Sequence, residues 1–250
     1  MKDWPYPRIV AHRGGGKLAP ENTLAAIRLG QSLGYRAHEF DVKLSKDAVS
    51  FLMHDATLER TTNGKGSAAD FTWAEIAALD AGSWHSAEFR GEHAASFADA
   101  AKLLRSKGTM AHVEIKPVPG FERQTGLQVA REAAEYWKGA AVPPLLSSFS
   151  FDALMAAKEA APHLPRAWLS HDPKDEDFEC LEALEAVALN TSHKKILASH
   201  VSRARQAGYR VLAYTVNEAP RAVELFDMGV DGIFTDNLRE FAGLFPSLIS

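Results

Sequence analysis

The 250-residue sequence predicts an α/β protein, a (β/α)8 TIM barrel with a small inserted subdomain after its second strand and the hairpin of that strand. Short β-rich segments alternate with helical segments rich in Ala, Leu and Glu, which implies parallel pairing of the strands. Eight such units in about 250 residues are typical of this barrel. A doubly wound open sheet is the alternative, because periodicity does not give the order of the strands.

The predicted strands are short apolar runs, and several of them end in polar residues. Polar side chains at the carboxyl ends of barrel strands line the mouth where such proteins build their sites. The eight strands are predicted over residues 8–12, 37–42, 110–116, 145–149, 166–170, 186–191, 210–216 and 232–236.

One further β-rich segment, residues 49–54, interrupts this alternation. The gap between it and residue 42 is too short for a parallel crossover, which needs about a dozen residues or more. We therefore expect the segment to fold back as a hairpin on the second strand. That fold brings His54 toward Glu39 and Asp41.

The connection that follows this hairpin is too long for a simple loop. It contains several glycines and two tryptophans, Trp73 and Trp84. We expect an inserted subdomain at about residues 56–97, at the barrel mouth, within a single domain that spans residues 1–250.

Helical patterns fill the connections between the strands. Glu21-Asn22-Thr23 leads into residues 24–30, which carry an apolar stripe and end in Gly30. Gly208 and Gly229 stand where helix C-caps are expected. Residues 178–181 are expected to be helical and to bury Cys180. Further helices are predicted over residues 96–106, 124–137, 150–160, 197–207 and 219–228.

The composition is that of an ordinary globular protein, with 46% hydrophobic residues, 24% charged residues and a net charge of -4. No dominant basic block is present, which argues against nucleic acid as a partner. No apolar run approaches the ~20 residues of a membrane span. A single cysteine and an N-terminus without signal-peptide features favour the cytoplasm. Self-association into a homo-oligomer stays open.

The first strand ends in His12-Arg13-Gly14-Gly15-Gly16. Glycines let the backbone approach a ligand closely and expose amides to an anion. An adjacent arginine can clamp a phosphate through two hydrogen bonds. Taken alone, the motif is equally well explained as a structural turn.

Two acids, Glu39 and Asp41, alternate along the second strand and therefore point to one face. Inside a barrel, two unpaired carboxylates would repel each other and lose solvation. A divalent cation removes both penalties, and carboxylate oxygens suit Mg²⁺ or Ca²⁺. Glu114 on the next barrel strand would add a third carboxylate. The alternative is a carboxylate pair bridged by Lys43 or another cation at the solvent edge.

The predicted strand over residues 110–116, which carries Glu114, has two further polar residues. Lys116 shares the face of Glu114 and offers a positive group for a phosphate. His112 faces the same way but lies deeper, which favours a hydrogen-bonded interior residue over a metal ligand.

His54 ends the hairpin strand. Its proximity to two acids favours a proton-transfer role together with His12 over a surface role. Tyr214, near a strand end, could form a wall for an organic group, although a core role is the more common one. The remaining histidines are expected to be structural or on the surface: His38, His85, His93, His163, His171, His193 and His200.

Taken together, these segments resemble the glycerophosphodiester phosphodiesterases, and residues 4–13 are especially similar to bacterial cytoplasmic members. The sequence departs from the usual pattern of this family at Ala94-Ala95-Ser96-Phe97 and at Tyr214. Both departures could alter the pocket that receives the alcohol group of the substrate. The matching segments follow one another through nearly the whole chain: His12-Arg13-Gly14, Pro20-Glu21-Asn22-Thr23, Glu39-Phe40-Asp41-Val42, His54-Asp55, Glu114-Ile115-Lys116, Ser148-Phe149, Tyr214-Thr215-Val216-Asn217 and Asp231-Gly232-Ile233-Phe234-Thr235-Asp236.

The resemblance implies a β/α barrel that hydrolyses glycerophosphodiesters to sn-glycerol 3-phosphate and an alcohol with one divalent cation, Mg²⁺ or Ca²⁺. Which histidine acts first, and whether a cyclic phosphate forms, stay open. The implied residues are the general base and acid His12 and His54, the metal ligands Glu39, Asp41 and Glu114, and the phosphate contacts Arg13 and Lys116.

Two alternatives are kept at this point. One is a phospholipase C-like or phospholipase D-like barrel that acts on intact phospholipids, which would need an apolar rim that docks on membranes. The other is a non-enzymatic barrel that binds phosphodiesters. Such a protein could lose either histidine at little cost, whereas this chain keeps both.

Overall fold

The computed structural model describes residues 4–250, so residues 1–3 of the predicted N-terminal segment lie outside the described residues. The strands follow the predicted segments closely. They are β1 (Ile9–Ala11), β2 (Ala37–Leu44), β3 (Ser50–Leu52), β4 (Met110–Ile115), β5 (Leu145–Ser148), β6 (Arg166–Ser170), β7 (Ala188–Ser192), β8 (Arg210–Tyr214) and β9 (Gly232–Thr235).

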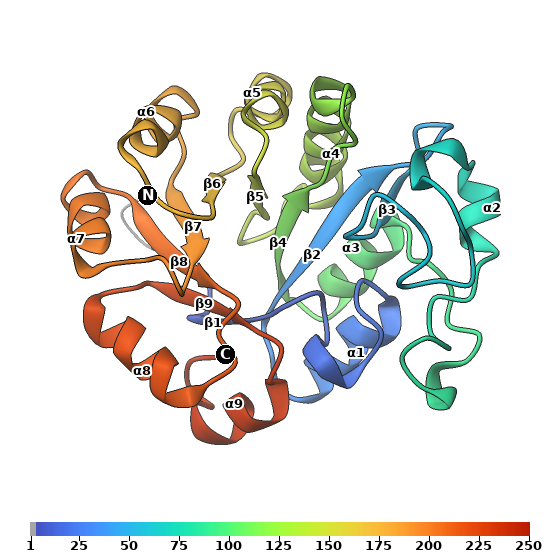
Figure 1. The fold of residues 1–250 in the computed structure, drawn as a ribbon, viewed down its shortest axis with the longest axis horizontal. Coiled ribbons are helices and arrows are strands. Elements are labelled where there is room, and N and C mark those ends of the chain that lie inside the picture. The colour runs from blue at the N-terminus through green and yellow to red at the C-terminus, as the bar shows by residue number, and fades with distance from the viewer. Residues whose placement is uncertain (1–3) are drawn as a thin grey trace.

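The sheet closes into a barrel. Its strand order is β1–β9–β8–β7–β6–β5–β4–β2–β3, and an additional pairing of β1 with β2 joins the ends of the eight parallel strands. Helices surround the strands on the outside, as Figure 1 shows. The predicted TIM barrel is therefore confirmed, and the open doubly wound sheet is wrong.

The helices mostly occupy the predicted segments, but two of them, α6 and α9, were not predicted as full elements. Helix α9 (Leu238–Leu244) follows the last strand. Between the strands lie α1 (Leu24–Ser32), α3 (Phe97–Ser106), α4 (Glu122–Tyr136), α5 (Phe151–Ala160), α6 (Asp175–Ala183), α7 (Ala198–Gln206) and α8 (Ala219–Met228).

The β2–β3 hairpin is present as predicted. Strand β3 pairs antiparallel with the far end of β2, with Lys43 opposite Phe51 and Val42 opposite Leu52. This extra strand lies outside the closed ring and leaves His54 just beyond its end.

Residues 53–96 form the connection between β3 and α3, and they pack beside the hairpin at the edge of the barrel (Figure 1). The connection contains the short helices η2 (Ala68–Asp70), α2 (Trp73–Ala77) and η3 (Ala87–Phe89). Its apolar core includes Leu58, Ala68 and Ile76, packed against Phe51 of β3. The insertion therefore has a small core of its own that is anchored on the hairpin.

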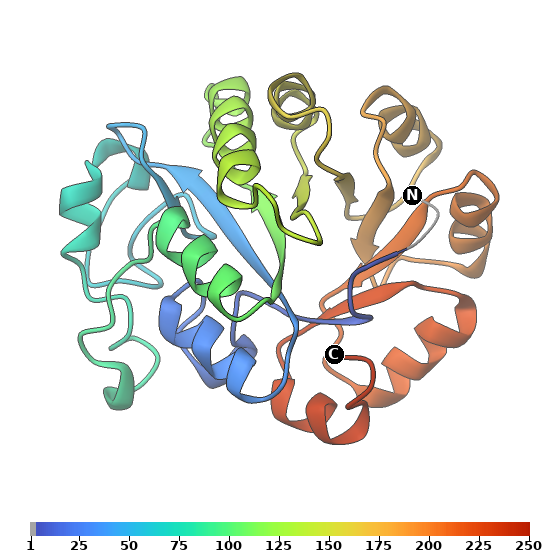
Figure 2. The ribbon, with the colours of Figure 1, turned by 180° about the vertical axis from the view of Figure 1, so that it is seen from behind.

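Inward-pointing residues at the amino ends of the strands fill one end of the barrel. Val10, Leu145, Leu212 and Phe234 belong to this buried cluster. The described N-terminal segment runs across the same end (Figure 2), where the Tyr6 hydroxyl donates to the Pro143 carbonyl at 2.8 Å. The opposite end of the barrel is left for polar side chains.

Within residues 4–250, no helix has both the length and the apolar character that crossing a membrane requires.

Candidate active site

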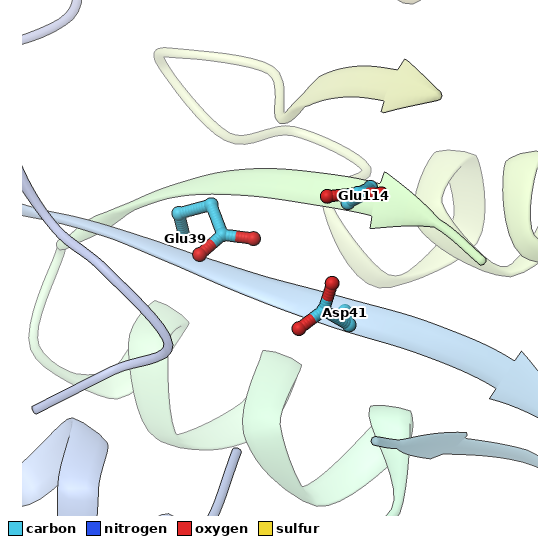
Figure 3. A group of neighbouring side chains, drawn as sticks. All are labelled: Glu39, Asp41 and Glu114. Carbon is cyan, nitrogen blue, oxygen red and sulfur yellow. The ribbon is translucent and has the colours of Figure 1, made fainter. Parts of the chain in front are cut away.

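Three carboxylates lie together on the neighbouring strands β2 and β4. One oxygen from each of Glu39, Asp41 and Glu114 lies within 4.8 Å of the other two. Figure 3 shows Glu39 and Asp41 on one strand and Glu114 on its neighbour. The parallel register explains the cluster, because Asp41 is the Cα partner of Glu114 across the β2–β4 ladder.

The loop after β1 holds two of these acids in place. The backbone amide of Arg13 donates to Glu39 Oε2 at 2.9 Å, and the Asn22 side chain donates to Asp41 Oδ2 at 2.8 Å. Asn22 Oδ1 also accepts from the backbone amide of Asp41. Arg13 and Asn22 both have positive φ angles of 50° and 59°, so a sharply bent loop is what aims these groups at β2.

Burial and mutual repulsion raise the pKa values of two carboxyl groups. The pKa of Glu39 rises to about 7, mainly through burial and then through the charge of Asp41. The pKa of Glu114 rises to about 8 for the same two reasons in the same order. Two of the three acids thus resist ionisation unless a cation is close by.

Asp41 behaves in the opposite way. Burial opposes its ionisation, but the charges of Lys116, His54 and Arg13 hold its pKa below the usual range. Asp41 is 1% exposed, so the predicted alternative of a carboxylate pair at the solvent edge is wrong.

The acidic cluster fits a divalent metal ion. Its donors are carboxylate oxygens, which suit a hard cation, and they come from rigid strands. A dication beside them would offset the repulsion that raises the pKa values of Glu39 and Glu114. These three residues are therefore the ones that could hold the ion.

Two lysines flank the cluster with different contacts. Lys116 Nζ donates to Glu114, lies 3.5 Å from Asp41 Oδ1, and sits 5.6 Å from the centre of the Phe149 ring. Lys43 is 2% exposed, and its Nζ donates to the backbone carbonyl of His54 at 3.1 Å. Lys43 therefore fixes the backbone of His54 instead of bridging the acids from solvent.

His12 is held by a carboxylate of its own. Its Nδ1 lies 2.6 Å from Asp236 Oδ1, and Nε2 lies 3.8 Å from Glu39 Oε2. Burial works to lower the pKa of His12, but the hydrogen bond to Asp236 and the charge of Glu39 outweigh it and raise this pKa. Asn217 donates to the second oxygen of Asp236 at 3.0 Å, which fixes the carboxylate plane.

His54, like His12, has an aspartate at Nδ1 of its ring. Its Nδ1 lies 2.7 Å from Asp55 Oδ1. Burial, followed by the charges of Lys116 and Arg13, lowers the pKa of His54 against the opposing charge of Asp41. With Nδ1 of each ring engaged by an aspartate, Nε2 is the nitrogen left for a substrate.

His112 is an interior residue, as predicted, but the predicted hydrogen bond is wrong. Neither ring nitrogen has a partner among the described residues. The ring packs edge-on against Tyr6 and Phe234, and burial lowers its pKa to about 3. Aromatic packing around a neutral imidazole therefore takes the place of the expected hydrogen bond.

Both imidazoles, two of the three carboxylates and the two cations Arg13 and Lys116 open into one cavity. An aromatic wall is formed by Phe149 and Tyr214, whose ring centres are 6.0 Å apart. Deeper in the cavity, Asn190 is 1% exposed and its Oδ1 has no hydrogen-bond partner among the described residues. The cavity is lined by His12, Arg13, Glu39, His54, Glu114, Lys116, Ser147, Phe149, Leu169, Asn190, Tyr214, Thr215 and Phe234.

The structure thus brings together every residue that the sequence marked for the site. Asp41 lies just beneath the lining, and the others face the cavity. No individual role was predicted for Asp236, Asn217, Asn22 or Asp55. The position of Asp236 at the end of a strand could have indicated that it belongs to the site. In contrast, nothing in the sequence around Asn22 indicates that its side chain contacts Asp41.

Comparisons with known proteins agree with this geometry. Residues 12–240 match the model of the glycerophosphoryl diester phosphodiesterase family. The chain belongs to this family. It is 33% identical over 233 residues to a glycerophosphodiester phosphodiesterase of Caldanaerobacter subterraneus subsp. tengcongensis, covering 92% of this chain and 93% of that protein. The chain is therefore an enzyme of the phosphodiesterase class.

Solved structures of similar proteins share the fold. A phosphodiesterase of Oleispira antarctica, in complex with its product sn-glycerol-3-phosphate, has a TM-score of 0.89 and 33% identity, covering 97% of this chain and 98% of that one. A glycerophosphodiester phosphodiesterase of Agrobacterium tumefaciens has a TM-score of 0.77 and 26% identity, covering 95% and 99% of the two chains.

Proposed function

We propose that this phosphodiesterase hydrolyses small glycerophosphodiesters to sn-glycerol 3-phosphate and an alcohol. The observation that carries the proposal is the cavity itself, which places two imidazoles, each oriented by an aspartate, beside an acidic cluster and two cationic side chains. The product bound to the Oleispira antarctica relative supports glycerol 3-phosphate as the product here as well.

His12 and His54 divide the proton transfers. Nε2 of His12 takes the proton of the hydroxyl that attacks the phosphorus atom. Nε2 of His54 protonates the alkoxide that leaves the phosphorus atom as the product alcohol. The Nδ1 contacts to Asp236 and Asp55 keep each ring in the tautomer that presents Nε2 to the cavity.

Arg13 and Lys116 stabilise the charge that develops on the phosphoryl oxygens. Both line the cavity. Arg13 Nε is buried, makes no hydrogen bond within the described residues and lies 3.9 Å from Asp41 Oδ2, so the guanidinium is held between the acidic cluster and the cavity. Tyr214 and Phe149 form the wall against which the organic part of the substrate packs.

Glu39, Asp41 and Glu114 would hold one divalent cation, Mg²⁺ or Ca²⁺. Bound there, the cation would supply Lewis-acid stabilisation of negative charge and a lower pKa for a hydroxyl. The protein's own contribution is to fix the three carboxyl groups on β2 and β4, with Glu39 and Glu114 losing their protons as the cation binds.

The wider setting is part of the same proposal. The chain acts as one domain over residues 1–250, with residues 56–97 as an insertion, on a small-molecule substrate in the cytoplasm. No nucleic acid takes part in the reaction.

The direct test is release of glycerol 3-phosphate from glycerophosphocholine and glycerophosphoethanolamine, with and without a chelator. His12→Ala and His54→Ala should each lower kcat about 10²–10⁴-fold, because acid–base groups contribute on that scale. His163→Ala, which removes an exposed imidazole, is the matched control and should leave the rate unchanged. Full activity in either site variant, or turnover of micellar phospholipid but not of soluble diesters, would contradict the proposal.

A further inference from the structure

Arg60 lies in the insertion shortly after β3, and its side chain is 43% exposed. It does not belong to the residues that line the cavity. Even so, its guanidinium contacts two carboxylates, Glu21 and Asp55, that come from different loops. Each of these carboxylates in turn contacts a residue of the site.

The first carboxylate leads to Arg13. Glu21 Oε2 accepts from Arg60 Nη1 at 2.7 Å, and Glu21 Oε1 accepts from Arg60 Nη2 at 2.8 Å. The same Oε1 accepts from Arg13 Nη1 at 2.7 Å. Glu21 is therefore a shared acceptor for the two guanidinium groups.

The second carboxylate leads to His54. Asp55 Oδ2 accepts from Arg60 Nε at 2.5 Å, and Asp55 Oδ1 accepts from Arg60 Nη2 at 3.0 Å. The same Oδ1 contacts His54 Nδ1 at 2.7 Å. Without Arg60, rotation of the Asp55 side chain would be limited only by the imidazole that it orients.

We propose that Arg60 is a positioning residue that fixes His54 and Arg13 relative to each other, through Asp55 and Glu21, by its paired hydrogen bonds to both carboxylates. The proposal rests on the proposed function for its effect on the rate. It adds a role for the insertion, which supplies to the site a guanidinium that never touches the substrate.

The contacts of Arg60 differ from those of an ordinary surface pair. Exposed ion pairs typically contribute about 0.2–1 kcal/mol to stability. Here the two carboxylates are mostly covered, with side-chain exposures of 13% for Glu21 and 28% for Asp55. The planar fork of arginine fixes direction as well as charge, which a lysine does not. We therefore expect loss of the Arg60 guanidinium to affect the orientation of Asp55 and Glu21 more than the stability of the fold.

The kinetic test compares two leaving groups. Glycerophosphocholine releases an alkoxide that needs a proton from His54, whereas glycerophospho-4-nitrophenol releases a phenolate that needs none. Arg60→Gln should lower kcat on glycerophosphocholine about 10–100-fold, since small misplacement of a catalytic group has costs of that order. The loss on the nitrophenyl ester should be at least about tenfold smaller.

Companion variants test the His54 side of the network. Asp55→Asn should reproduce the selective loss of Arg60→Gln, and the double variant should be little worse than either single one. Arg60→Lys should not restore the ratio of the two rates. Arg123→Gln is the matched control, because Arg123 also donates a pair of hydrogen bonds to one carboxylate, that of Glu159, on exposed helices. This variant should leave both rates unchanged.

A second measurement needs no turnover. In spectra of ¹⁵N-histidine-labelled protein, the Nδ1 proton of His54, assigned with His54→Ala, should be observed in the parent and broadened or lost in Arg60→Gln. An unchanged resonance, equal losses on both substrates or full rescue by lysine would overturn the proposal. If the parent releases no glycerol 3-phosphate but the resonance responds as expected, the proposed function fails and the positioning role stands.

Discussion

At the scale of single residues, the two imidazoles of the cavity occupy contrasting environments. The pKa of His12 is raised despite burial, because Asp236 and Glu39 are close, whereas burial and nearby cations lower the pKa of His54. A group with a raised pKa is the stronger base, and one with a lowered pKa is the stronger acid when protonated. Shifts in opposite directions therefore support His12 as the base and His54 as the acid.

Asp236→Asn tests this environment directly. Loss of the carboxylate removes a contribution that raises the pKa of His12, and the base acts only when neutral. The acidic limb of kcat/KM should therefore move to lower pH, while the maximal rate falls about a hundredfold because the tautomer is no longer fixed. A pH–rate profile measures both effects.

Asp227→Asn, at an exposed position on α8, serves as the control for Asp236→Asn and should leave the profile unchanged. An acidic limb that stays in place or moves to higher pH in Asp236→Asn would contradict the role assigned to Asp236.

At the scale of elements, helix α1 shows where a local pattern was misleading. The sequence predicts an end of the helix at Gly30, but α1 continues to Ser32, and it is Gly34 that follows the helix with a positive φ, of 92°. A Cβ on Gly30 would lie 2.5 Å from the Gly14 carbonyl and 2.7 Å from the His38 ring. The glycine is required by close packing against the loop after β1, not by helix termination.

Gly30→Ala should lower the free energy of unfolding by about 1–3 kcal/mol, because backbone has to move to admit the methyl group. Gly243→Ala is the matched change in α9, where a Cβ meets nothing within 4 Å. It should be neutral or stabilise by up to about 1 kcal/mol, since alanine favours helix. Urea unfolding measures both. Equal effects of the two substitutions would show that the close approach at Gly30 is unimportant.

Helix α6 was predicted only over residues 178–181, and helix α9 was not predicted, for physical reasons. Helix α6 opens with Asp175, Glu176 and Asp177, which favour a helix N-terminus but obscure an apolar stripe, and Leu181 is its one fully buried residue. Helix α9 has seven residues, too few for a period to be recognised. Both are stabilised by packing on the barrel.

At the scale of the whole molecule, the barrel concentrates negative charge at one end. The three carboxylates of the cluster come from two strands, and the cations that offset them come from β1, β4 and their loops. Burial at this convergence keeps two carboxyl groups poorly ionised. A bound dication would therefore change the stability of the whole fold.

Mg²⁺ or Ca²⁺ should raise the midpoint temperature of thermal unfolding. At an ion concentration of a hundred times Kd, the free energy of unfolding should increase by about 2.7 kcal/mol. The effect should be larger at pH 9 than at pH 6, because Glu39 and Glu114, with pKa values of about 7 and 8, must lose their protons to bind. Glu114→Gln should reduce the shift. A midpoint unchanged by either ion, or raised equally by KCl, would argue against the site.

The sequence by itself determined the alternation of strands and helices, the hairpin, and which acids and basic residues share a face. Alternation within strands fixes which side chains share a face, and a short gap forbids a parallel crossover. These are local constraints that need no knowledge of distant contacts.

Only the tertiary structure decided which groups orient the catalytic residues. Asp236 meets His12 because β9 closes on β1, and Arg60 joins Glu21 to Asp55 because the insertion folds back toward the loop before α1. The tertiary structure also surrounded His112 with aromatic rings instead of hydrogen-bond partners. Such contacts join residues far apart in the chain, and no local period encodes them.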